Sequence, residues 1–121
     1  MLHLRLPVFA TLVAVVAVST AASSFAATPK LVGTVGPGYK ITLTKAGLKV
    51  TKLKAGKYTF VINDKSSFHS YALDGPNKLE KDFTSIPFKG TKTITLTLKK
   101  GKYKYYCAAH ESSMFGHLTV T

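Results

Sequence analysis

The sequence has 121 residues and a formal net charge of +12, from 17 lysine and arginine residues against 5 acidic ones. This length leaves room for a single domain, and the chain contains no internal repeat or low-complexity stretch. A strongly basic chain raises the question of nucleic acid, but the lysines belong to no recognition module, so we expect no nucleic-acid partner.

The first 26 residues follow the three-part pattern of a secretory signal. Arg5 is the only formally charged side chain before an apolar run at residues 8–18, and mostly small residues come next. Residues 24–26, Ser-Phe-Ala, place small side chains at the two positions that signal peptidase inspects. We therefore predict a cleavable signal peptide at residues 1–26, a domain at residues 27–121, and a secreted or periplasmic protein. An uncleaved membrane anchor is the alternative, but the run is shorter than the roughly 20 residues of a spanning helix, so the mature form should have no transmembrane span.

The rest of the chain alternates apolar and polar residues at period two, which predicts strands with one buried face. In chain order, the alternating segments are residues 40–44, 58–62, 93–98 and 117–121. Turn signals rich in glycine, proline and asparagine separate the strands, at residues 36–38, 55–56, 74–77 and 100–101. Residues 73–89 are less regular, and we expect a loop or a short helix there. Seven or eight short strands at this spacing predict an all-β Greek-key β-sandwich.

A single cysteine, Cys107, remains after the signal is removed. It cannot form a disulfide within its own chain, although small exported domains often depend on disulfides. A lone thiol in an oxidising compartment needs protection by burial, by bonding to another chain or by holding a metal. Cys107 is therefore the first candidate functional residue.

Three more residues with metal-binding chemistry accompany this cysteine. His110 follows at C-x-x-H spacing, Met114 follows at H-x-x-x-M spacing, and His69 lies upstream. Thiolate and thioether are soft donors that suit Cu(I), and imidazole also serves Cu(II). Two histidines and a cysteine in a plane, with a weak axial methionine, form the blue-copper electron-transfer site. Such a ligand set leaves no coordination position open for a substrate. We therefore expect that the protein is not an enzyme.

Each of these residues also has a purely structural interpretation. Cys107 or Met114 alone could fill a gap in the core, and His69 alone could be an exposed or hydrogen-bonded residue. His117 alternates with Leu118 and is predicted to face solvent. Zinc is the competing metal, but structural zinc sites use four strong nitrogen or sulfur ligands and not methionine. The joint presence of the four residues favours copper, with one ion per chain.

The sequence around these residues resembles the cupredoxin family, and within it the plastocyanin-like small blue (type 1) copper proteins. The most specific likeness is residues 101–120, which resemble the family ending G-x-Y-x-[FY]-Y-C-x-x-H…M-x-G-x-[LV]-x-V. Residues 58–63 and 68–70 resemble the strand and first-histidine region of the family. The resemblance implies a one-electron carrier that cycles between Cu(I) and Cu(II). It also implies equatorial ligands His69, Cys107 and His110 and an axial ligand Met114.

The sequence departs from plastocyanins at three places. The His110–Met114 interval is one residue shorter, Ala109 stands where a proline is common, and Ser70 replaces an asparagine that usually bonds across the site. Hydrogen bonds around the ligands tune a metal. The residues we expect around the metal or on the electron path are Asn63, Ser70, Tyr106, Ala108 and Ala109. The resemblance further implies that His110 reaches the surface, where the two small alanines let a partner approach.

The positive charge offers an argument about partners. Tyr103, Tyr105 and Cys107 share one face of the last ligand strand, so Tyr106 should lie on the other face, ringed by lysine. We therefore expect a redox partner protein that is acidic, or an anionic envelope surface, while simple solubility is the alternative explanation of the charge. The chain itself is expected to be a monomer.

Two other function classes remain open from the sequence. A copper-binding or copper-delivery protein could use the same ligands without transferring electrons. A metal-free sandwich could serve adhesion, because a fold alone does not determine function, but the intact ligand set argues against it.

Overall fold

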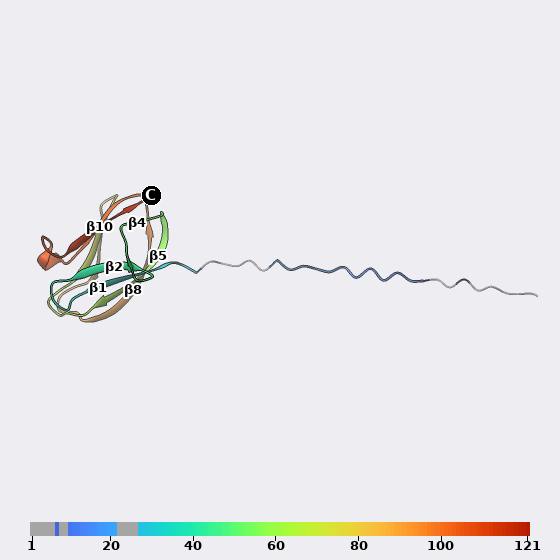
Figure 1. Ribbon diagram of the computed structural model, residues 1–121, viewed down its shortest axis with the longest axis horizontal. Helices are drawn as coiled ribbons and strands as arrows, with labels where there is room; N and C mark the ends of the chain where they lie inside the picture. Colours follow the sequence, from blue (N-terminus) through green and yellow to red (C-terminus); the bar gives the residue numbers. More distant parts are fainter. Residues whose placement is uncertain (1–6, 8–9, 22–26) are drawn as a thin grey trace, which may run out of the picture.

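The computed structural model describes residues 7, 10–21 and 27–121, and its folded part is a sandwich of two five-stranded sheets (Figure 1). The strands are β1 (Lys30–Val35), β2 (Ile41–Lys45), β3 (Leu48–Lys49), β4 (Lys52–Leu53), β5 (Gly56–Asp64), β6 (Tyr71–Gly75), β7 (Leu79–Thr84), β8 (Gly90–Leu98), β9 (Gly101–Tyr106) and β10 (Phe115–Val120). Eight of these strands have five residues or more, and β3 and β4 have two each. The predicted all-β sandwich of seven or eight strands is confirmed, with two short edge strands added.

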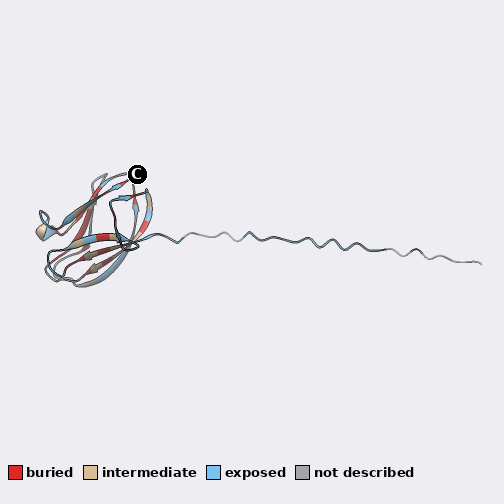
Figure 2. Ribbon diagram, viewed as in Figure 1, coloured by how far each residue is buried: buried red, intermediate tan, exposed pale blue. Residues whose placement is uncertain are grey.

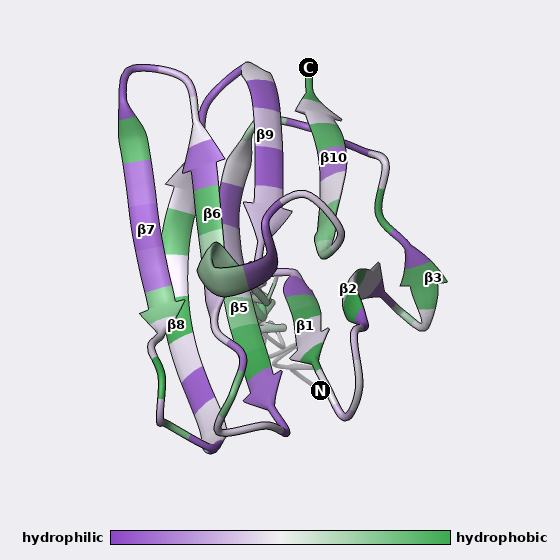
Figure 3. Cartoon of the chain, turned by 90° about the vertical axis from the view of Figure 1, so that its left-hand side faces the viewer, coloured by the Kyte–Doolittle hydropathy of each residue, from purple (hydrophilic) through white to green (hydrophobic). Residues whose placement is uncertain are grey.

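The first sheet has the strand order β3-β2-β1-β5-β8 and the second has the order β4-β10-β9-β6-β7. The pairs β1–β5 and β4–β10 are parallel, and the other pairs are antiparallel. One 3-10 helix, η1 (Ala108–His110), lies between β9 and β10. It sits at the end of the sandwich opposite the N-terminal segment, and Figure 3 views the molecule from that end. This end, which the β9–β10 connection forms, carries the candidate site.

The core lies between the two sheets and is built by alternate residues, as the period-two pattern predicts. On β5, Tyr58, Phe60 and Ile62 are buried, while the residues between them are half-buried. The strands β1, β9 and β10 show the same alternation, whereas β6 begins with three buried residues in succession (Figure 2). On β10, His117 is exposed and Leu118 is buried, so the prediction that His117 faces solvent is confirmed.

The segment at residues 73–89 differs from its prediction. Instead of a loop or a short helix, most of it forms the antiparallel hairpin of β6 and β7. The hairpin is held by Phe83, which is 1% exposed and packs against the rings of Phe60 and Tyr71. The turn is closed by Asn77 and Lys78, which both adopt positive φ angles.

The described part of the N-terminal segment does not pack against the sandwich. Residues 10–21 are exposed, carry no regular secondary structure and extend away from the domain (Figure 1). The predicted cleavage site at residues 24–26 lies outside the described residues, so the signal peptide at residues 1–26 stays a prediction. Among the described residues, no helix is long and apolar enough to cross a membrane.

Candidate metal centre

Cys107 stands directly after β9 and begins a loop that is held by its own backbone. The Cys107 N–H donates to the Met114 carbonyl at 3.0 Å, and the Cys107 carbonyl accepts from the His110 N–H at 3.0 Å. The Met114 N–H donates to the His110 carbonyl at 2.8 Å. The C-x-x-H-x-x-x-M spacing therefore folds into one compact turn that fixes all three residues relative to each other.

His69 arrives from the connection between β5 and β6, which is shaped by a buried carboxylate. Asp64 is 2% exposed, and its Oδ1 accepts from the Ser66 N–H at 3.1 Å. Ser66 in turn accepts from the His69 N–H through its carbonyl and from the Phe68 N–H through its hydroxyl. A side chain that bonds the backbone two residues on is a common way to hold a turn. Here this turn delivers His69 to the end of the sandwich.

The two segments bring one sulfur and two imidazoles together. The Cys107 Sγ lies 3.8 Å from Nδ1 of His69 and 3.7 Å from Nδ1 of His110. All three donor atoms lie within 4.8 Å of one another. Cys107 and His69 are buried and His110 is half-buried. The same nitrogen, Nδ1, faces the sulfur in both histidines.

These separations fit a shared metal ion. Metal–sulfur bonds of about 2.3 Å and metal–nitrogen bonds of about 2.0 Å, spread near 120° apart, leave sulfur and nitrogen roughly 3.7 Å apart. A soft thiolate with two imidazoles suits copper in both oxidation states. Met114, which is 1% exposed, belongs to the same buried core as Cys107.

Known structures share this architecture. No family profile matches the chain, and no characterised protein sequence matches it either. A Met-to-Gln variant of rusticyanin aligns with a TM-score of 0.50 at 19% identity, covering 76% of each chain. An oxidised Met-to-Leu variant of amicyanin aligns with a TM-score of 0.51 at 14% identity, covering 75% of this chain and 81% of that one. The chain has the cupredoxin fold. This confirms the fold class that the sequence predicts, and it places the three donor atoms at one end of a cupredoxin sandwich.

Ser70 joins the segment that carries His69 to the segment that carries Cys107. Its backbone N–H donates to Cys107 Sγ at 3.4 Å, and its hydroxyl lies 4.0 Å from the same sulfur. The hydroxyl also accepts from the Ala108 N–H at 3.2 Å. Ser70 thus bonds across the site, the role that the resemblance implies for an asparagine at this position in plastocyanins.

Asn63, which the sequence places around the metal, bonds instead to the neighbouring strand of its own sheet. Its Oδ1 accepts from the Thr91 hydroxyl on the neighbouring strand at 2.9 Å. The buried Asp64, one residue later, is the side chain that bonds into the His69 turn. Period two explains the difference, because successive residues of β5 point to opposite faces of the sheet.

Ala108 and Ala109 lie where the sequence places them, on the surface beside the half-buried His110. Both belong to η1, and neither side chain is large enough to cover the neighbouring imidazole.

Tyr106 has different surroundings from those predicted. Its hydroxyl donates to Asp74 Oδ1 at 3.0 Å. Burial, the bond to Asp74 and the negative charges of Asp74, Glu111 and Asp82 raise the pKa of Tyr106 to about 12. Lys104 does lie over the Tyr106 ring, at 5.5 Å, but it pairs with Glu111 at 3.0 Å. The predicted ring of lysine is wrong, because the hydroxyl bonds to Asp74 and the lysine over the ring pairs with Glu111.

Tyr39 is a site residue that the sequence analysis missed. Its ring centroid lies 5.0 Å from that of His110 and 5.4 Å from that of His69. The two imidazoles lie 5.0 Å apart, so the three rings form one cluster. In the sequence, Tyr39 is distinguished only by following the Gly36-Pro37-Gly38 turn. That position does not predict a contact with His69 or His110.

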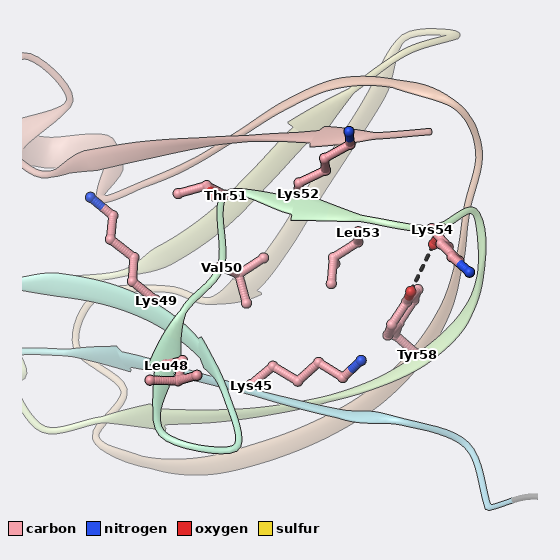
Figure 4. Close-up of a pocket in the computed structure, with 9 residues that line it drawn as sticks. All are labelled: Lys45, Leu48, Lys49, Val50, Thr51, Lys52, Leu53, Lys54 and Tyr58. Atoms are coloured by element: carbon pink, nitrogen blue, oxygen red, sulfur yellow. Dashed lines mark hydrogen bonds between the residues drawn. The ribbon is translucent and has the colours of Figure 1, made fainter.

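A groove of about 550 Å³ lies apart from the metal centre, along the edge strands β3 and β4 (Figure 4). Its floor is apolar, and four lysines line it. Figure 4 shows Lys45 reaching across the groove, whereas the ends of Lys49 and Lys54 point outwards. The lysines therefore do not converge on one point, and none of His69, Cys107 and His110 lines this groove.

Proposed function

We propose that this chain is an exported type 1 copper protein that carries single electrons between redox partners. His69, Cys107 and His110 would hold one copper ion per chain, and Met114 would supply a weaker fourth ligand. The observation that carries the proposal is the convergence of Cys107 Sγ and the two histidine Nδ1 atoms within 4.8 Å. The cupredoxin fold supports the same assignment.

Copper supplies the one-electron step by cycling between Cu(I) and Cu(II). The chain contributes a fixed geometry, because two sheets and two hydrogen-bonded loops hold the donor atoms. Little has to rearrange when an electron arrives. The ligand set fills the coordination positions, which supports an electron carrier rather than an enzyme.

The electron exit is at His110. His69 is 5% exposed, whereas His110 is half-buried and sits in the surface loop. Ala108 and Ala109 leave room for a partner on that side. Tyr106, which is adjacent to Cys107 in the chain, is instead bonded to Asp74 on the neighbouring strand β6.

The charges near the site divide between the two sheets. Lys65 and Lys89 line one groove with Pro37 at the site end of the first sheet, and the acid in its lining, Asp64, is buried. On the second sheet, Asp74 accepts from Tyr106 and Glu111 pairs with Lys104. We propose that an acidic partner, or an anionic envelope surface, binds on the side of the first sheet. There Lys65 and Lys89 are not paired with Asp74 or Glu111.

The protein is proposed to act as a monomer outside the cytoplasm, after removal of residues 1–26. The three-part pattern of that segment supports export. Mass spectrometry of the secreted protein tests this, with a mature chain that begins at Ala27 as the expected result. A mature species that keeps residues 8–18 would contradict it.

A titration with Cu(II), followed by voltammetry, tests the carrier function. We expect uptake of one ion per chain, then a reversible one-electron wave and fast electron self-exchange between oxidised and reduced protein. The same stoichiometry with slow self-exchange would indicate copper binding or delivery instead. Failure to bind copper at one equivalent would remove the proposal altogether.

A further inference from the structure

Tyr39 is largely exposed and still contacts the candidate metal centre. Its side chain is 71% exposed, yet one part of its ring packs on both histidines of the metal centre. The ring planes meet that of His110 at 87° and that of His69 at 63°. Edge-to-face contacts of this kind are favourable for aromatic pairs. The rest of the ring faces solvent at the end of the sandwich.

The backbone before Tyr39 is built to hold it there. Gly36 and Gly38 have φ angles of 68° and 75°, which favour glycine. A Cβ on Gly36 would lie 2.9 Å from the Ser66 Cβ and 3.6 Å from the His69 ring. The Gly36 N–H donates to the Lys40 carbonyl at 2.9 Å and closes the turn around Tyr39. The turn therefore packs on the His69 segment and fixes where the ring can lie.

We propose that Tyr39 is a positioning residue that covers the outer edges of His69 and His110. It holds the two imidazoles at their angle to each other and keeps small external ligands away from the copper ion. This inference rests on the proposed function, because the edges it covers belong to the proposed copper ligands.

The physical argument is one of access. His69 is nearly inaccessible, so a small anion must reach the metal from the half-buried His110 side. On that side Ala108 and Ala109 are small, and Tyr39 is the large ring in contact with the imidazole. Removing the ring opens a path, and it also removes the contact that limits how far the imidazole can turn.

Three variants test the proposal. Tyr39→Ala removes the ring, Tyr39→Phe keeps the ring without the hydroxyl, and Phe68→Ala is a matched control. Phe68 is 76% exposed and adjacent to His69, but among the described residues no ring contact joins it to either imidazole. The Phe variant should behave as wild type, because the contact is made by the ring.

The first measurement uses metal-free protein and records the NMR positions of the carbon-bound ring protons of both histidines. Tyr39→Ala should move them by removing the ring current, and Tyr39→Phe should leave them close to wild type. The second measurement adds azide to the Cu(II) protein and follows the visible spectrum. Tyr39→Ala should bind azide roughly two- to tenfold more tightly, the factor that corresponds to one aromatic contact.

The two measurements separate the inference from the proposed function. Wild-type protein that fails to bind copper ends the proposed function, while the metal-free measurement still reports on the Tyr39 contact. Histidine protons that stay in place in Tyr39→Ala overturn the inference. Azide affinity that is unchanged in Tyr39→Ala, or raised equally in Phe68→Ala, overturns it as well.

Discussion

The backbone N–H of Ser70 donates a hydrogen bond to the sulfur of Cys107, and the serine hydroxyl accepts one from the amide of Ala108. One residue thus stabilises the proposed thiolate ligand and joins the His69 segment to the Cys107 loop. Hydrogen bonds around the sulfur of a blue-copper site tune its reduction potential. Ser70 is therefore expected to affect the potential and the stability together.

Ser70→Ala should lower the reduction potential by a few tens of millivolts. The hydroxyl stops withdrawing electron density from the sulfur, so Cu(II) gains stability over Cu(I). The Ala108 N–H also loses its acceptor, which should reduce the free energy of unfolding by about 1–3 kcal/mol. Voltammetry and denaturant unfolding measure the two effects, with Ser70→Thr as the control that keeps a hydroxyl. An unchanged potential in Ser70→Ala would show that the serine hydroxyl does not influence the sulfur.

The proposed axial and equatorial ligands should respond differently to removal. Met114→Leu should keep copper bound and raise the reduction potential, because a weak donor has been replaced by an apolar group. His69→Ala should open an equatorial position to water or added imidazole and lose the normal spectrum. Visible spectra and voltammetry of both variants provide the comparison. Equal damage from the two changes would contradict the assignment.

Asp64 offers a test of how the His69 loop is held. Its Oδ1 accepts from the Ser66 N–H, while no partner for its buried Oδ2 lies among the described residues. Asp64→Ala should lower the free energy of unfolding by about 1–3 kcal/mol, since the Ser66 amide loses its acceptor. Asp64→Asn keeps that acceptor and should retain stability within about 1 kcal/mol of wild type. Denaturant unfolding of both variants checks this, and equal losses would mean that the turn does not depend on the Oδ1 bond.

The Tyr106–Asp74 pair predicts a shifted titration at high pH. The pKa of Tyr106 is raised from 10.0 to about 12 by burial and by Asp74. A group whose folded pKa is raised stabilises the fold below its ordinary pKa and loses that effect as the pH rises through the folded value. The contribution should thus be complete below about pH 10 and lost towards about pH 12. The tyrosinate absorbance of Tyr106 is the difference between a protein with Tyr106 and the same protein with Tyr106→Phe. The pKa obtained from it should be lower in Asp74→Asn than in the wild-type protein. An unshifted pKa in that variant would remove Asp74 as a cause.

Features that depend on local spacing were predictable from the sequence. Period-two alternation on β5 and β10 marked which residues would be buried, because strand geometry ties side-chain direction to position. The Cys107–His110–Met114 loop was recognisable since its members lie within one turn of each other. His69 was identified as a candidate ligand by its residue type and by the resemblance to the family. In the structure its Nδ1 lies 3.8 Å from the Cys107 sulfur.

Features that depend on contacts between distant segments were not predictable. The β6–β7 hairpin was missed because charged residues mask the alternation in Leu79–Thr84, and burial of Phe83 against the other sheet decides its structure. Tyr106 was expected to be ringed by lysine, but the loop after η1 brings Glu111 beside Lys104. Tyr39 reaches the site only because the Gly36–Gly38 turn folds onto the His69 segment.

The central claim is that the Cys107 thiolate binds copper, and visible absorption after adding Cu(II) tests it most directly. The wild-type protein should turn intensely blue at one equivalent of copper, through charge transfer from the thiolate to Cu(II). Cys107→Ser should take on no such colour, because a hydroxyl is neither a soft donor nor ionised at neutral pH. Wild-type protein that binds copper and stays colourless would contradict the account, because the sulfur would then not be a ligand.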